Sequence, residues 1–165
     1  MPPIDPASDP VATLACAVVS LNRSDGGVPK RPVPEARITR LGMAGDHQRN
    51  LKHHGGPDRA LCLFSLEVIE RLRAEGHPIT PGSAGENITI SGLDWRLVVP
   101  GSALSIGEVA LELTAFTMPC RTIAESFVGR RSSRISQLTH PGESRVYARV
   151  VREGVVCVGD PVSLL

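Results

Sequence analysis

Aromatic residues are scarce in this chain of 165 residues. It holds three Phe, one Trp and one Tyr, and its basic residues do not form a run with interleaved aromatics. Proteins that bind single-stranded nucleic acids stack bases on aromatic side chains along basic grooves. The formal net charge is only +1, so no global electrostatic field draws the chain to nucleic acid or to an anionic membrane. We therefore expect neither kind of partner.

Lysine is almost absent as well, since the basic residues comprise sixteen Arg and only two Lys, Lys30 and Lys52. A pyridoxal enzyme needs a Schiff-base lysine, and both lysines lie in expected loops, which argues against that class. Arginine suits bidentate capture of phosphate or carboxylate, although a compositional bias is the simpler explanation. The basic stretch Val28-Pro29-Lys30-Arg31 could contact phosphate, but such a loop is more often just solvated.

Long apolar runs are also lacking. The only early one, Val11–Leu21, is too short to span a bilayer, and Asp5 and Asp9 precede it without a basic residue, unlike a signal peptide. The four cysteines are spread evenly through a chain that is too large to need disulfide staples. We therefore expect a cytoplasmic protein with free thiols, composed of a flexible arm over 1–10 and a single domain over 11–165.

Short strands with frequent turn signals dominate the remaining pattern. Strands are predicted over 11–21, 36–41, 88–90, 96–99, 103–106, 109–116, 145–152, 155–158 and 161–165. Tight turns at 106–109 and 153–154 predict two hairpins. The clearest helix is Ser65–Glu75 with Ser65 as its N-cap, and one or two short helices are expected over 122–138. The pattern is typical of a mainly β, α+β domain built on a closed or nearly closed antiparallel barrel.

Cys120 is the most informative single residue. It lies in Thr117-Met118-Pro119-Cys120-Arg121, directly after an apolar alternating run, where the proline cannot extend a strand ladder. A thiol at the end of a strand is expected at a cavity mouth. The adjacent arginine favours the thiolate, which is the form that attacks and binds metals.

The alternative for any free cysteine is a buried and inert thiol, which is its commoner fate. That interpretation suits Cys16, Cys62 and Cys157, because each lies within an apolar run. It suits Cys120 less well because of its proline and arginine neighbours.

Two glycine-bearing loops are further candidates. In Gly45-Asp46-His47 and His53-His54-Gly55-Gly56-Pro57-Asp58, the paired glycines allow close backbone approach to a ligand or an anion-binding nest. A zinc site is disfavoured because the two histidines are adjacent, and a glycine turn with a hydrogen-bonding histidine is the simpler interpretation. No Lys follows the glycines of Gly82-Ser83-Ala84-Gly85-Glu86-Asn87, so this loop matches no nucleotide-binding motif. Its Glu86 is expected to be solvated, or else to orient a neighbour.

The chain resembles the MOSC domain in an ordered set of short motifs: Val28-Pro29-Lys30, Gly45-Asp46, His54-Gly55-Gly56, Gly85-Glu86-Asn87, Pro119-Cys120 and Gly159-Asp160. This domain occurs at the C-terminus of molybdenum cofactor sulfurases and as stand-alone bacterial proteins. The resemblance covers roughly residues 11–165. It implies a β-barrel core decorated by short helices, with a pocket where the HGG-type loop, the GEN-type loop and the cysteine converge.

The resemblance also implies residue roles. Cys120 would be a thiolate ligand of molybdenum, as in relatives that bind the molybdenum–pterin cofactor, or would carry a persulfide, as in the sulfurases. The residues that would shape the cofactor pocket are His54, Gly55, Gly56, Gly85, Glu86 and Asn87. Lys30 would contact the cofactor phosphate. Many relatives have an arginine two residues before the proline, where this chain has Thr117, and Arg121 could supply the missing charge.

The resulting hypothesis is a molybdenum-dependent oxidoreductase that reduces small N-hydroxylated compounds. Its electrons would come from a partner protein, because the sequence contains neither a flavin motif nor a cysteine cluster for iron–sulfur. One alternative is a persulfide carrier, or a module that binds the cofactor without turnover. Another is a pocket without metal that binds a different anionic small molecule, an idea that Thr117 keeps open.

Overall fold

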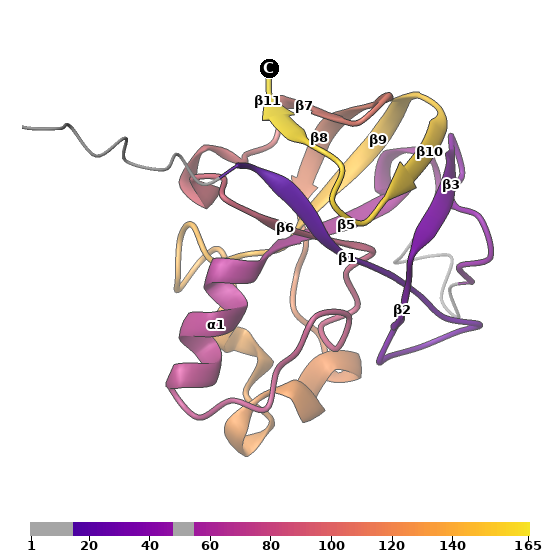
Figure 1. Cartoon of the computed structure of the whole chain (residues 1–165). Helices are drawn as coiled ribbons and strands as arrows, with labels where there is room; N and C mark the ends of the chain where they lie inside the picture. The colour runs from indigo at the N-terminus through magenta and orange to yellow at the C-terminus, as the bar shows by residue number, and fades with distance from the viewer. Residues whose placement is uncertain (1–14, 48–54) are drawn as a thin grey trace, which may run out of the picture.

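The computed structural model describes residues 15–47 and 55–165, which form a mainly β domain with few helices, as predicted (Figure 1). The strands are β1 (Ala17–Arg23), β2 (Arg31–Val33), β3 (Glu35–Thr39), β4 (Gly42–Met43), β5 (Leu61–Ser65), β6 (Ile88–Ser91), β7 (Ala103–Ile106), β8 (Val109–Phe116), β9 (Val146–Arg152), β10 (Gly154–Cys157) and β11 (Val162–Leu164). The helices are α1 (Leu66–Ala74) and the short 3-10 segments η1 (Pro57–Arg59), η2 (Trp95–Leu97), η3 (Arg121–Ser126), η4 (Val128–Arg130) and η5 (Ser132–Ile135).

Eight strands form one sheet in the order β11-β7-β8-β9-β5-β6-β1-β2, and three strands form another in the order β10-β3-β4. The pair β5–β6 is parallel, which corrects the prediction of a purely antiparallel architecture. Parallel neighbours need a crossover between them, and α1 lies in the segment that joins these two strands.

Strand pairing among the described residues does not close the large sheet into a barrel, since β11 and β2 remain as its edges. An isolated bridge nevertheless joins Ala17 to Pro161, and the Val162 amide donates to the Cys16 carbonyl at 2.9 Å. These contacts place the start of β1 beside β11.

The predicted hairpin between β9 and β10 is wrong. Only Glu153 separates the two strands, whereas the tightest common hairpins need a loop of about two residues. Strand β10 pairs instead with β3, with Val156 opposite Ala36. The strand expected over 96–99 is also wrong, because the Asp94 carboxylate accepts from the Arg96 amide and caps η2.

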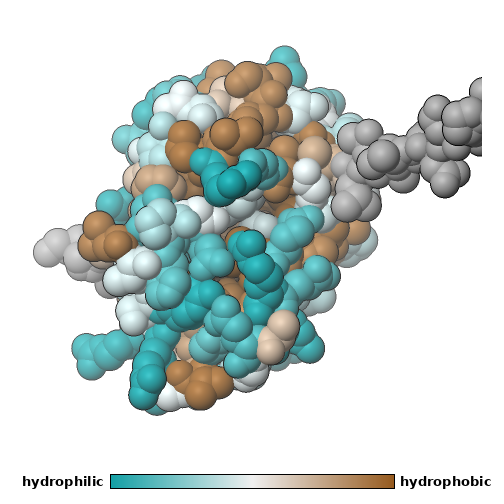
Figure 2. All heavy atoms as spheres, turned by 90° about the vertical axis from the view of Figure 1, so that its left-hand side faces the viewer, coloured by the Kyte–Doolittle hydropathy of each residue, from teal (hydrophilic) through white to brown (hydrophobic). Residues whose placement is uncertain are grey.

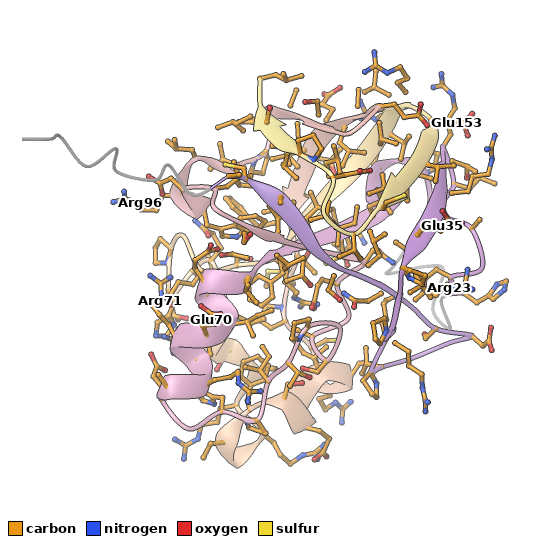
Figure 3. The ribbon with its side chains drawn as sticks, viewed as in Figure 1. Arg23, Glu35, Glu70, Arg71, Arg96 and Glu153 are labelled. Carbon is orange, nitrogen blue, oxygen red and sulfur yellow. The ribbon has the colours of Figure 1, made fainter. Side chains whose placement is uncertain are left out.

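The predicted helix and its cap are confirmed in α1. The Ser65 hydroxyl accepts a hydrogen bond of 3.2 Å from the Val68 amide, as N-cap residues do. Apolar α1 side chains are buried against the core, while Glu70 and Arg71 lie on the outside of the helix (Figure 3). On the side of the molecule that carries α1, hydrophilic side chains cover most of the lower half (Figure 2). None of the helices in the described ranges has the length and apolar character needed to cross a membrane.

The core is centred on β5, which lies between β9 and β6 in the large sheet. All five β5 residues are buried, including Leu61, Leu63 and Phe64, which have no exposed surface. Because its inward and outward faces are both covered, β5 lacks the polar–apolar alternation of a half-buried strand. This strand carries Cys62 into the middle of the molecule.

Candidate functional site

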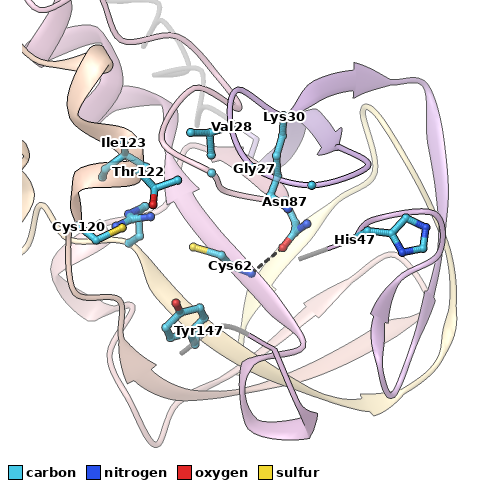
Figure 4. A pocket seen from close by; sticks show the side chains of 13 residues that line it. Gly27, Val28, Lys30, His47, Cys62, Asn87, Cys120, Thr122, Ile123 and Tyr147 are labelled. Atoms are coloured by element: carbon cyan, nitrogen blue, oxygen red, sulfur yellow. Dashed lines mark hydrogen bonds between the residues drawn. The ribbon is translucent and has the colours of Figure 1, made fainter. Parts of the chain in front are cut away.

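A cavity of about 360 Å³ opens beside β5, the start of β9 and the loop before β2 (Figure 4). Its volume lies within the range of small-molecule sites, about 300–1,000 Å³. The residues that line it are Gly26, Gly27, Val28, Lys30, His47, Cys62, Gly85, Asn87, Cys120, Thr122, Ile123, Arg145 and Tyr147. The predicted residues Lys30, Gly85, Asn87 and Cys120 are therefore brought together.

Cys120 lies directly before η3 and is half-buried in the cavity wall. Pro119 follows β8 and cannot extend its ladder, so the thiol is presented directly before η3 and not within a strand. The sequence predicts Cys120 at a cavity mouth, and its half-buried position in the cavity wall agrees with that prediction. Within the described part of the chain, no three His, Cys, Asp or Glu side chains gather as a metal cluster.

Cys62 is a second thiol in the same cavity and was missed by sequence reasoning. It is buried, as predicted, but its sulfur points into the cavity from the side opposite Cys120 (Figure 4). The main-chain N–H of Cys62 donates a hydrogen bond of 3.0 Å to the side-chain amide oxygen of Asn87. The Cys62 sulfur lies 3.6 Å from the Thr117 hydroxyl. Burial raises the pKa of the Cys62 thiol, so this sulfur stays protonated.

Lys30 lies in a polar network that fixes one wall of the cavity. Its ammonium donates to both carboxylate oxygens of Asp46, at 2.7 and 2.6 Å, and both side chains are more than nine-tenths buried. Asp46 also accepts from the Asn87 side-chain amide at 2.8 Å and from the Ser24 main-chain amide at 2.9 Å. The charge of Lys30 is therefore already matched by that of Asp46.

Arg145 is the main functional candidate that the sequence did not reveal. Only 4% of it is exposed, and it donates to the carbonyls of Ala84 at 2.7 Å and Met118 at 3.4 Å. Arg121, expected to supply positive charge, is instead exposed and outside the lining. Arg145 directly precedes β9, and its local sequence carries no signal of this burial.

Tyr147 contributes a buried phenol from β9, and its hydroxyl points into the cavity (Figure 4). The Arg59 guanidinium lies over the Tyr147 ring, 5.4 Å from its centroid. Burial, reinforced by the neighbouring Cys62, raises the pKa of Tyr147 to about 12. The phenol is consequently protonated near neutral pH, and its hydroxyl is a group that can donate a hydrogen bond.

Glu86 is completely buried, so the expectation that it is solvated is wrong. One carboxylate oxygen accepts from the Gly82 amide and the Thr89 hydroxyl, and the other has no hydrogen-bond partner among the described residues. Burial raises the pKa of Glu86. This side chain lies behind the lining and braces the loop that carries Gly85, whose φ of +81° suits glycine.

Only part of the HGG-type loop, His54-Gly55-Gly56, lies within the described residues. His54 lies outside the described residues, whereas Gly55 and Gly56 are described and have φ values of +99° and +82°. Neither glycine is part of the cavity lining. Their role in a cofactor pocket stays a prediction.

Comparisons with known proteins point to one family. The MOSC domain matches residues 50–163. The uncharacterized protein YflK of Bacillus subtilis is 30% identical over 141 residues, which are 84% of this chain and 63% of YflK. A reductase of Gibberella moniliformis is 28% identical over 129 residues, which are 75% of this chain and 22% of the reductase. The chain thus spans less than two thirds of either relative.

A solved structure shares the fold. The crystal structure of YiiM from Geobacillus stearothermophilus has a TM-score of 0.71 and 25% sequence identity to this chain. The superposition covers 91% of this chain and 75% of YiiM. The likeness therefore extends over most of the chain.

Proposed function

Because the chain belongs to the MOSC domain family, we propose that its cavity binds a molybdenum–pterin cofactor with Cys120 as the thiolate ligand. The observation that carries the proposal is the half-buried thiol of Cys120 in a cavity of about 360 Å³. Lys30 and Arg145 contribute cationic groups to this lining, and its described residues include no carboxylate.

The donor set fits such a group. Soft thiolate ligands suit soft metal centres, and the cofactor is an anion that carries a phosphate and a dithiolene. Cys120 is reachable from the cavity, whereas Cys62 is held protonated by burial and is unsuited to ligation. The remaining metal ligands would come from the cofactor.

The proposed reaction is reduction of a small N-hydroxylated compound, for which the bound cofactor would supply the redox chemistry. Cleaving an N–O bond to an N–H bond and water consumes two electrons and two protons. Tyr147 can give a proton or a hydrogen bond to the leaving oxygen because its phenol is protonated and faces the cavity. The electrons would come from a donor protein. The reductase among the relatives supports this direction of chemistry.

Metal analysis tests the proposal. The full chain, Cys120→Ala and the control Cys157→Ala would be made in a host that synthesises the cofactor, and molybdenum and pterin would be measured. Cys157 is the matched control because it is a half-buried thiol on β10, outside the lining. We expect equimolar molybdenum in the wild type and Cys157→Ala, and its loss in Cys120→Ala.

Two results of the metal analysis would contradict these expectations. A wild type without molybdenum or pterin would remove the proposal, and undiminished molybdenum in Cys120→Ala would remove the ligand role of Cys120. Treatment with cyanide separates the alternative of sulfur carriage. Thiocyanate released by the wild type, but not by Cys120→Ala, would indicate a persulfide on this thiol.

A further inference from the structure

Arg145 is a buried cation without a counter-ion in the described part of the chain. Only 4% of the residue is exposed, and no described carboxylate lies within ion-pair distance of its guanidinium. Its Nε is buried and has no hydrogen-bond partner among the described residues. Buried charges in proteins are normally paired, because desolvating an unpaired ion is costly.

The existing contacts of Arg145 orient the guanidinium without neutralising it. The carbonyls of Ala84 and Met118 each accept one hydrogen bond from its terminal nitrogens. Glu86 is the buried acid whose pKa responds to this arginine, yet it forms no ion pair with it, and burial favours the neutral form of Glu86. The second carboxylate oxygen of Glu86 is itself without a partner in the described chain.

The position of Arg145 directs its charge to the cavity. It shares the lining with Cys120 and Tyr147, and its anchor Met118 lies two residues before Cys120. Lys30 also lines the cavity, but its ammonium is bound by Asp46 at 2.6 Å. Arg145 is thus the cation of the described lining whose charge is left for an incoming anion.

We propose that Arg145 forms an oxyanion subsite in the wall that holds Cys120. A phosphate or carboxylate group would pair with the planar guanidinium, which matches such groups in a two-pronged geometry. Two sources share this chemistry, the phosphate of the cofactor and an anionic group of the substrate. The choice between these sources rests on the proposed function, whereas the subsite itself does not.

Inorganic phosphate tests the subsite on the full chain prepared without cofactor. Binding would be measured by calorimetry, and also as protection of Cys120 from alkylation by iodoacetamide, with Cys157 as the unprotected internal reference. The variants are Arg145→Gln, Arg145→Lys and the control Arg149→Gln. Arg149 lies four residues further along, on β9, but its side chain is 42% exposed and already paired with Asp58 and Glu112.

We expect phosphate to bind the wild type and Arg149→Gln with similar affinity. Arg145→Gln should bind phosphate about tenfold more weakly or worse, because the charge-assisted pair is lost. Arg145→Lys should have an affinity between those of the wild type and Arg145→Gln, because lysine keeps the charge without the two-pronged geometry. Equal affinity in the wild type and Arg145→Gln, or no phosphate binding to the wild type, overturns the proposal. Where Arg145→Gln fails to fold, Arg145→Lys carries the comparison, and an affinity equal to that of the wild type would then overturn the two-pronged role of the guanidinium.

A second arm identifies the source of the anion in protein loaded with cofactor. A fall in pterin content in Arg145→Gln, with no calorimetric binding of phosphate to the loaded wild type, assigns the subsite to the cofactor phosphate. Unchanged pterin content, with phosphate still bound by the loaded wild type, assigns it to the substrate. Failure of the wild type to take up cofactor would contradict the proposed function and leave the first arm intact.

Discussion

The main-chain amide of Thr117 donates a hydrogen bond of 2.9 Å to the carbonyl of Arg145, which makes the two residues neighbours where β8 ends and β9 begins. Thr117 occupies the position at which the family resemblance suggests an arginine. Arg145 lies in the cavity wall, whereas Arg121 is exposed and outside it. The neighbouring segment thus places a guanidinium in the cavity wall beside Thr117.

The two cavity thiols should differ in reactivity. Burial raises the pKa of Cys62, so little thiolate is present at mildly alkaline pH, whereas Cys120 is half-buried and reachable. Limited treatment with iodoacetamide followed by peptide mass spectrometry should show modified Cys120 while Cys62 remains intact. Faster modification of Cys62 than of Cys120 in the folded chain would contradict this order.

The Lys30–Asp46 pair should contribute strongly to stability. Asp46→Ala leaves the buried ammonium of Lys30 without its partner, and such a change costs about 3–5 kcal/mol in the free energy of unfolding. Urea denaturation measures the loss. Glu112→Ala is the matched control, because the Arg149–Glu112 pair is nearly half exposed and should cost about 1 kcal/mol or less. Similar losses in both variants would show that the buried Lys30–Asp46 pair contributes no more to stability than the exposed Arg149–Glu112 pair.

Glu86 should make stability fall with rising pH. Its pKa is raised in the folded state above the ordinary value of 4.5, so the folded chain holds this proton more tightly than the unfolded chain. The contribution is therefore complete below about pH 4.5 and is lost as the pH rises through the folded pKa. Glu86→Gln should remove this decline and be at least as stable as the wild type near neutral pH, as measured by denaturant unfolding across pH.

Glu75 provides a control of opposite sign. A hydrogen bond from Arg134 lowers the pKa of Glu75, so its contribution is present above pH 4.5 and is lost as the pH falls. Glu75→Gln should therefore lose stability near neutral pH. If the stabilities of Glu86→Gln and the wild type changed in parallel with pH, folding would not raise the pKa of Glu86.

Tyr147→Phe should lower the turnover proposed for the cavity without removing the cofactor. A positioned proton donor contributes about 10²–10⁴-fold to a rate, so we expect a loss of kcat of about a hundredfold or more with unchanged molybdenum content. The pKa of about 12 also predicts that wild-type activity does not fall between pH 7 and pH 10 through ionisation of this phenol. Unchanged kcat in Tyr147→Phe would exclude its role as donor.

Local signals in the sequence predict much of the fold. The cap at Ser65 and the hairpin between β7 and β8 are confirmed because neighbouring residues specify them. Strand β5 was missed because it is buried on both faces and has no alternation, so its pattern does not distinguish it from other apolar runs. The pairing of β10 with β3 joins segments more than a hundred residues apart, and no local turn signal reports such a partner.

The candidate site is predictable to a similar degree. Cys120 was identified by its proline and its position after a strand, and Lys30, Gly85 and Asn87 by resemblance. Arg145 was missed because an arginine at the start of a strand usually points to solvent. Its burial arises from the packing of the 82–87 loop against β9, where Ala84 accepts its hydrogen bond, and that contact is absent from local sequence.

The polar network of Lys30, Asp46 and Asn87 crosses the boundary of the recognised family segment. The match begins at residue 50, but the glycines at 26 and 27, Lys30 and Asp46 all precede it. A version of the protein trimmed to residues 50–163 would retain both thiols and Arg145 yet lose the partner strands β1 to β4. It would expose Asn87 on an open flank, so the recognised segment is shorter than the unit that encloses the cavity.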